Sequence, residues 1–131
     1  WFFPRTESVM EYKNHLTKDV EILDMKDQGV LSAIIGVRPC DARSLLVLDK
    51  VFSWDYKDDF YLKARQSTLI ITLVCNELGK DCFCESLGIP LDSTEGADIL
   101  LRKSDGGKFS LSVASEKGKK IFEQAQAETD H

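Results

Sequence analysis

This chain has little of what nucleic-acid-binding and membrane-spanning proteins need. Its 131 residues carry 22 acidic and 17 basic side chains, a net charge of −5, and the basic residues form no cluster that could follow a phosphate backbone. The longest apolar runs, residues 32–37 and 68–75, are far shorter than the roughly 20 residues that cross a bilayer. The sequence therefore predicts neither a nucleic-acid partner nor a membrane span.

A secretory signal and a well-placed histidine are also missing. Residues 1–4, WFFP, have no charged start and no extended apolar stretch, which indicates a cut into a larger protein rather than a signal for export. The two histidines, His15 and His131, lie near the chain ends, where neither is placed to act as the base for a cysteine nucleophile. We therefore expect a reducing cytoplasmic location and no papain-like catalysis.

What remains is an ordinary globular composition, with 43% hydrophobic and 30% charged residues. At this length a chain buries a core without disulfides to hold it. We expect residues 1–131 to form a single domain, which represents the central part of a longer protein. The four cysteines are then expected to bind metal or to do redox work.

The clearest elements are two apolar, β-branched runs at residues 31–37 and 68–74, which are typical of parallel strands buried on both faces. Between them, residues 39–53 and 58–66 have acidic first turns, and Pro39 suits a helix start. A strand, helix, helix, strand order predicts that the two strands are parallel neighbours.

The flanking segments have weaker patterns. Residues 4–14 are compatible with a short helix, and residues 20–25 alternate like an edge strand. Two later segments, 97–103 and 108–114, flank a Ser-Asp-Gly-Gly turn, and Ser115 can cap a final helix over 116–127. The predicted fold is α/β: a small mixed sheet containing parallel buried strands, flanking helices, and a C-terminal hairpin plus helix.

The cysteines gather around the ends of the two apolar strands. Cys40 follows the first strand, Cys75 follows the second, and Cys82 and Cys84 lie in the loop that leaves Cys75. Adjacent parallel strands lie about 4.8 Å apart and end at the same sheet edge, so we expect the four thiols to converge. Cys40 also stands at a helix start, where the positive dipole end favours a thiolate.

Four thiolates suit a tetrahedral zinc or an iron–sulfur cluster. The spacing is neither that of a zinc ribbon nor that of a bacterial ferredoxin, so it leaves zinc, a cluster and a reversible disulfide open. A lone cysteine after a strand is more often a small buried hydrophobe, whereas three cysteines in a glycine-bearing loop favour ligation. The polar neighbours are expected to be caps or surface charges, although they could tune a cluster: Arg38, Asp41, Arg43, Asn76, Glu77, Lys80 and Ser86.

Three segments resemble a known family: FFPRTESVMEY at 2–12, GVRPCDARSLLVLDKVF at 36–52, and TLIITLVCNELGKDCFCESLGIPLDSTEGADILL at 68–101. The family is that of the iron–sulfur electron-transfer subunits typified by those of anaerobic sulfite reductase and by the sulfhydrogenase beta subunit, which are 4Fe-4S dicluster proteins. The likeness covers most of the chain, and the two cysteine-bearing segments are its specific part.

The resemblance implies a subunit that passes electrons within an oxidoreductase complex, between a flavin- or NAD(P)-binding partner and a hydrogenase or reductase partner. It also implies that Cys40, Cys75, Cys82 and Cys84 are ligands of a [4Fe-4S] cluster and that the chain is not catalytic alone. The family's two-cluster ferredoxin domain is absent from this sequence. The alternative is a non-redox docking domain for partner subunits, with a structural zinc or idle cysteines.

Overall fold

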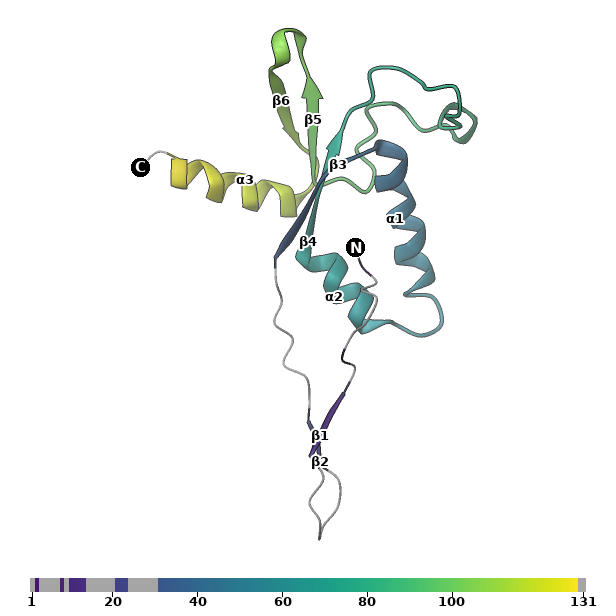
Figure 1. Ribbon diagram of the computed structural model, residues 1–131, viewed down its shortest axis with the longest axis vertical. Helices are drawn as coiled ribbons and strands as arrows, with labels where there is room; N and C mark the ends of the chain where they lie inside the picture. Colours follow the sequence, from purple (N-terminus) through teal and green to yellow (C-terminus); the bar gives the residue numbers. More distant parts are fainter. Residues whose placement is uncertain (1, 3–7, 9, 14–20, 24–30, 130–131) are drawn as a thin grey trace.

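A four-stranded mixed sheet forms the centre of this computed structural model (Figure 1). The structure describes residues 2, 8, 10–13, 21–23 and 31–129. The four strands lie side by side in the order β3 (Ser32–Val37), β4 (Thr68–Leu73), β5 (Ile99–Lys103) and β6 (Phe109–Val113).

The strand directions follow from the connections. Strand β3 pairs in parallel with β4, with Ile34 opposite Ile70, so the predicted parallel neighbours are confirmed. Strand β5 is also parallel to β4, and β6 returns antiparallel to β5 across the short turn Asp105–Gly107. The predicted α/β class, with parallel strands and a C-terminal hairpin and helix, is confirmed.

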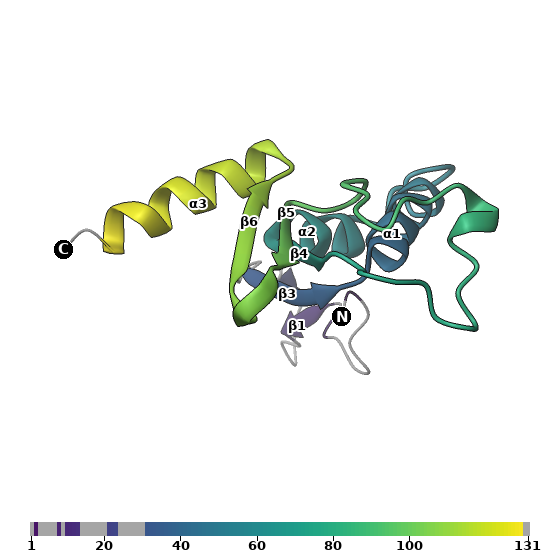
Figure 2. The same ribbon diagram turned by 90° about the horizontal axis from the view of Figure 1, so that it is seen from above.

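The described residues form three α-helices, and two of them start at capped ends. Helix α1 (Pro39–Val51) is followed by α2 (Asp59–Ser67), whose N-cap Asp58 accepts a 3.0 Å hydrogen bond from the Tyr61 amide. Helix α3 (Glu116–Thr129) begins after Ser115, whose hydroxyl oxygen accepts from the Gly118 amide at 3.0 Å. The views in Figures 1 and 2 place α1 and α3 on opposite sides of the sheet. No helix in the described ranges combines the length and apolar character that a membrane crossing requires.

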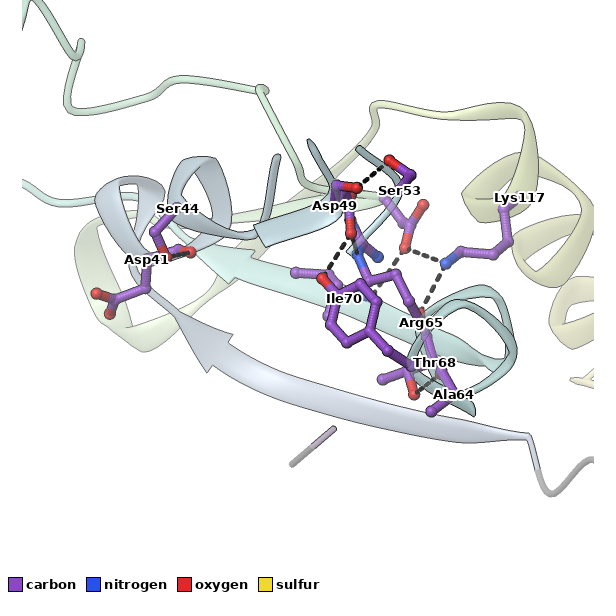
Figure 3. Close-up of polar contacts among 11 residues, drawn as sticks. Asp41, Ser44, Asp49, Ser53, Ala64, Arg65, Thr68, Ile70 and Lys117 are labelled. Atoms are coloured by element: carbon purple, nitrogen blue, oxygen red, sulfur yellow. Dashed lines mark hydrogen bonds and ion pairs between the residues drawn. The ribbon is translucent and has the colours of Figure 1, made fainter. Parts of the chain in front are cut away.

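The main core lies between the sheet and helices α1 and α2. Tyr61 is 1% exposed, and its ring stacks on Phe52 with centroids 4.4 Å apart and meets Phe2 edge-on at 5.8 Å. Ile70 of β4 is fully buried in the same cluster. The Tyr61 hydroxyl donates a 2.6 Å hydrogen bond to Asp49, which also pairs with Arg65 at 3.3 Å (Figure 3). This packing ties α1 and α2 together.

The buried Tyr61 hydroxyl predicts a specific alkaline behaviour. Burial, and then the hydrogen bond to Asp49, raise the pKa of Tyr61 well above its ordinary value. Because the folded state favours the neutral phenol, this contribution to stability is complete below the unfolded pKa near 10 and is lost as the pH rises toward the folded pKa.

We expect Tyr61→Phe to lower the free energy of unfolding by about 1 kcal/mol at neutral pH, since one hydrogen bond is lost. The difference from the parent protein should shrink as the pH rises through the range in which tyrosine ionises. Urea denaturation from about pH 8 to about pH 11 measures this difference. A difference that stays constant or widens across that range contradicts the assignment.

Asp98, directly before β5, connects strand β4 to the start of helix α3. One of its carboxylate oxygens accepts from the Ile70 amide at 2.9 Å and pairs with Lys117 at 3.0 Å. The other oxygen accepts a 2.6 Å hydrogen bond from the Ser115 hydroxyl, and Lys117 also donates to the Thr68 carbonyl at 2.7 Å. Asp98 is 7% exposed, so this is a buried carboxylate whose partners are all in place.

Two sequence expectations are wrong. Strand β3 is an edge strand that is not buried on both faces, because Ile35 is 68% exposed. Part of the helix predicted over 4–14 is strand β1 (Glu11–Lys13), which pairs antiparallel with β2 (Glu21–Leu23) in a separate two-stranded sheet. Strand β2 confirms part of the strand expected at 20–25. Much of residues 4–14 and both histidines lie outside the described residues.

Candidate four-cysteine site

The four cysteines line a single hollow of about 590 Å³ at the carboxyl ends of β3 and β4. Cys40 is the second residue of α1, and Cys75 lies two residues beyond the end of β4. Cys82 and Cys84 come from the loop that follows. The structure therefore brings the lone cysteine and the group of three to one place, as parallel neighbouring strands predict.

The position of Cys40 beside the hollow depends on a kink at the end of β3. The register between β3 and β4 shifts between Ile35 and Val37, and the intervening Gly36 has a φ of 85°. Glycine is the residue that adopts this conformation without strain. Pro39 then begins α1, where its missing amide hydrogen costs nothing. The kink and the proline turn the chain directly from strand into helix, so that Cys40 lies at the rim of the hollow.

Local hydrogen bonds shape the segment of residues 76–88, here called the cysteine loop. The Gly79 amide donates to the Cys82 sulfur at 3.2 Å, and the Cys82 amide donates back to the Gly79 carbonyl at 3.1 Å. Cys84 precedes a short 3₁₀ turn, and its carbonyl accepts from the Leu87 amide at 3.1 Å and from the Ile89 amide at 2.9 Å. Cys75 is held from the other side, since its amide donates to the Leu91 carbonyl at 3.1 Å.

The pKa of the Cys40 thiol differs from the expectation that the helix dipole favours a thiolate. The position of Cys40 at the start of α1 is as predicted, but partial burial and the neighbouring Asp41 carboxylate raise the pKa of the Cys40 thiol. A hydrogen bond with Cys84 contributes in the same direction. The helix dipole therefore does not decide the protonation of Cys40, and without a metal this thiol is a poor nucleophile at neutral pH.

The donor set fits a soft metal, although the sulfurs are not gathered into a ligand shell. All four cysteines are free of disulfides; Cys82 is exposed and the other three are half-buried. Across the described part of the chain, no three histidine, cysteine, aspartate or glutamate side chains stand close enough together to hold a metal ion. Four thiols around one hollow match the ligand chemistry of zinc and of iron–sulfur clusters.

A second hollow of about 640 Å³ reaches three of the same cysteines, Cys40, Cys82 and Cys84. Its wall includes Val47 of α1 together with Phe83 and Leu87 of the cysteine loop. These three side chains are between 55% and 64% exposed. Sequence reasoning did not single them out, and the apolar residue between the two cysteines of Cys-Phe-Cys was the available signal.

The polar residues that flank the cysteines in the sequence differ in which of the two hollows they line. Arg38 lines both hollows, Asp41 lines the second one, and Asn76 and Glu77 line the first. Arg43 lines the second hollow and pairs with Glu95 at 2.9 Å. Two further residues named from the sequence line neither hollow: Lys80 and Ser86.

Comparison with known proteins finds a curated relative. The chain is 31% identical over 98 residues to sulfhydrogenase 2 subunit beta from Pyrococcus furiosus. The match covers 75% of this chain and 28% of the relative, so the chain corresponds to little more than a quarter of that protein. No family model and no solved structure matches the chain. The chain is therefore similar to a part of a sulfhydrogenase subunit, and the resemblance is at the level of the family.

Proposed function

We propose that this domain binds a [4Fe-4S] cluster through Cys40, Cys75, Cys82 and Cys84 and transfers electrons in an oxidoreductase of the hydrogenase or sulfite reductase type. The observation that carries the proposal is the shared hollow, which is lined by four free thiols from two strand ends and the loop that follows β4. Similarity to a sulfhydrogenase subunit supports the same conclusion. The partners would be a hydrogenase or reductase subunit together with a flavin- or NAD(P)-binding subunit.

The chain supplies the surroundings that such a cluster uses. The cluster itself supplies one-electron redox chemistry when bound. The Gly79 amide already donates to the Cys82 sulfur, and hydrogen bonds of this kind are one means of tuning a cluster potential. Because no three thiols stand at ligating distance among the described residues, binding requires the loop of residues 76–84 to close toward Cys40 and Cys75. Cys82 is the exposed member of the four, and its hydrogen bonds to Gly79 would have to move with it.

Iron and sulfide analysis tests the proposal. The chain is reconstituted anaerobically with ferrous iron and sulfide, and we expect a brown protein with about four iron and four sulfide per chain. Cys40→Ser and Cys75→Ser remove ligands from two different strand ends, and each should lose most of the bound iron. Ser86→Ala, an exposed change within the cysteine loop, is the matched control and should retain it.

Three results would contradict the proposal: a colourless protein without iron, equal iron in the parent protein and both cysteine variants, or stoichiometric zinc that iron does not displace. The zinc result supports the docking alternative, in which the cysteines stabilise a scaffold. Far-ultraviolet circular dichroism of each variant separates loss of iron from loss of the fold.

A further inference from the structure

Among the residues that the structure describes, no layer covers part of one sheet face. Five large apolar side chains, here called the open sheet face, come from β3, β4 and β6: Ile35, Leu73, Phe109, Leu111 and Val113. Their exposed fractions are 68%, 37%, 58%, 42% and 41% in that order. Scattered apolar residues are normal on a protein surface, but a continuous group on one sheet is not.

The strand register places these residues on a common face. Residues paired across neighbouring strands project to the same side of a sheet. Ile35 is paired with Ile71, Leu73 with Leu101, and Leu101 in turn with Leu111. Val113 is paired with Ile99, and Phe109 with Lys103, in the same ladder. The side chains therefore form one apolar surface across all four strands.

The opposite face of the sheet is covered at β4, although Ser110 of β6 on that face is exposed. Ile70 and Thr72 of β4 are fully buried there, and Ile70 belongs to the core that α1 and α2 complete. Helix α3 lies against the beginning of the open side, where a Cβ atom added at Gly118 would lie 3.2 Å from a side-chain atom of Ile99. Ile99 is accordingly 4% exposed. Toward the carboxyl ends of the parallel strands the apolar surface is uncovered, whereas parallel strands normally have layers on both faces.

We propose that the open sheet face is a homodimer interface, in which a second copy of this chain packs its own open sheet face against the first. An interface with two-fold symmetry must be complementary to itself. This surface meets that condition, because its five members are uncharged and the one charged residue in their ladder, Lys103, lies at the end of β5. Two such sheets pack face to face about 10 Å apart.

The available area reaches the lower limit of a specific interface. Fully exposed side chains of this size present roughly 150–200 Å², so the open sheet face exposes on the order of 450 Å² of side-chain surface per copy. Two copies bury about twice that amount. The half-buried Ile71 and Leu101 and the stem of Lys103 bring the total past the roughly 1,000 Å² of a specific interface. The dimer is independent of the proposed cluster, because none of these side chains is a cysteine.

Sedimentation velocity over a wide concentration range tests the dimer. The measurement uses the metal-free chain with excess reductant, so that neither a cluster nor an intermolecular disulfide affects the result. We expect a reversible monomer–dimer equilibrium. Leu111→Glu places a charge from each copy in the apolar interface and should raise the dimer Kd at least about tenfold.

Two further variants make the result decisive. Phe109→Glu lies at the start of β6 and is 58% exposed, so it tests the same face with little risk to folding. Ser110→Glu introduces the same charge on the same strand but on the other face, and it should leave the Kd unchanged. A monomer at every concentration overturns the proposal, as does a dimer that Phe109→Glu leaves intact or that Ser110→Glu weakens equally.

Discussion

Replacing Asp98 with alanine is expected to lower the free energy of unfolding by about 2–4 kcal/mol, because a buried carboxylate with three polar partners is removed. The change strips the Ile70 amide and the Ser115 hydroxyl of an acceptor and leaves Lys117 without its carboxylate. Asp98 is 7% exposed, so water does not fully replace the lost bonds. Urea denaturation followed by circular dichroism measures the change.

The chain offers a matched control for Asp98. Asp92 pairs with Arg102 at 3.0 Å, the same separation as the Asp98–Lys117 pair, but its side chain is 55% exposed. Asp92→Ala should cost no more than about 1 kcal/mol, since exposed ion pairs contribute little. Equal effects of the two substitutions would show that burial of Asp98 does not govern its contribution.

Replacing Gly96 with alanine should cost more than about 3 kcal/mol, because strain and overlap combine there. Gly96 has a φ of +78°, and a Cβ atom at this position would lie 2.0 Å from the Ala42 carbonyl oxygen. Ala42 is fully buried in α1, so the backbone cannot move away without disturbing the core. Chemical denaturation reports the loss.

The variant Gly106→Ala separates the cost of the left-handed backbone conformation from the cost of steric overlap. The φ of Gly106 is +81°, close to that of Gly96, but a Cβ atom there meets no atom within 4 Å. Gly106→Ala should therefore show only the cost of the left-handed conformation, about 1–2 kcal/mol. If both variants lose the same stability, the close approach of Gly96 to α1 is not a significant constraint.

The Gly96 contact also connects stability to the cysteine site. Ala42 lies in the first turns of α1, two residues after Cys40, so the chain around Gly96 packs directly on the helix that presents this cysteine. Displacing that turn moves Cys40 relative to Cys75 across the hollow. We therefore expect Gly96→Ala to reduce iron incorporation as well as stability, and iron and sulfide content together with chemical denaturation measures both.

Local sequence signals predicted the main elements well. Two β-branched apolar runs indicated parallel strands, the acidic residues at 58–59 indicated a helix start, Ser115 indicated a helix cap, and the Ser-Asp-Gly-Gly turn indicated a hairpin. These features depend on neighbours along the chain, which a sequence displays directly. The helix expected over residues 4–14 is wrong at Glu11–Lys13, because the apolar pattern there is too brief to separate a helix from a strand.

The buried role of Asp98 and the exposure of Ile35 were not predictable in the same way. An aspartate before a strand looks the same in the sequence whether its carboxylate meets water or, as Asp98 does, three polar partners. An apolar strand likewise shows no sign that one of its faces lacks a covering layer. Both properties depend on residues distant in sequence: Lys117 in α3 for Asp98, and the sheet edge for Ile35.

The sequence by itself determined that Cys40 and Cys75 follow two parallel strands, and hence that the four cysteines share one end of the sheet. Only the tertiary structure decided how closely they approach: the thiols line one hollow without forming a ligand shell among the described residues, and burial with Asp41 raises the pKa of the Cys40 thiol. The physical reason is that strand order follows from local patterns, whereas sulfur positions and pKa values depend on loop packing and burial, which long-range contacts set.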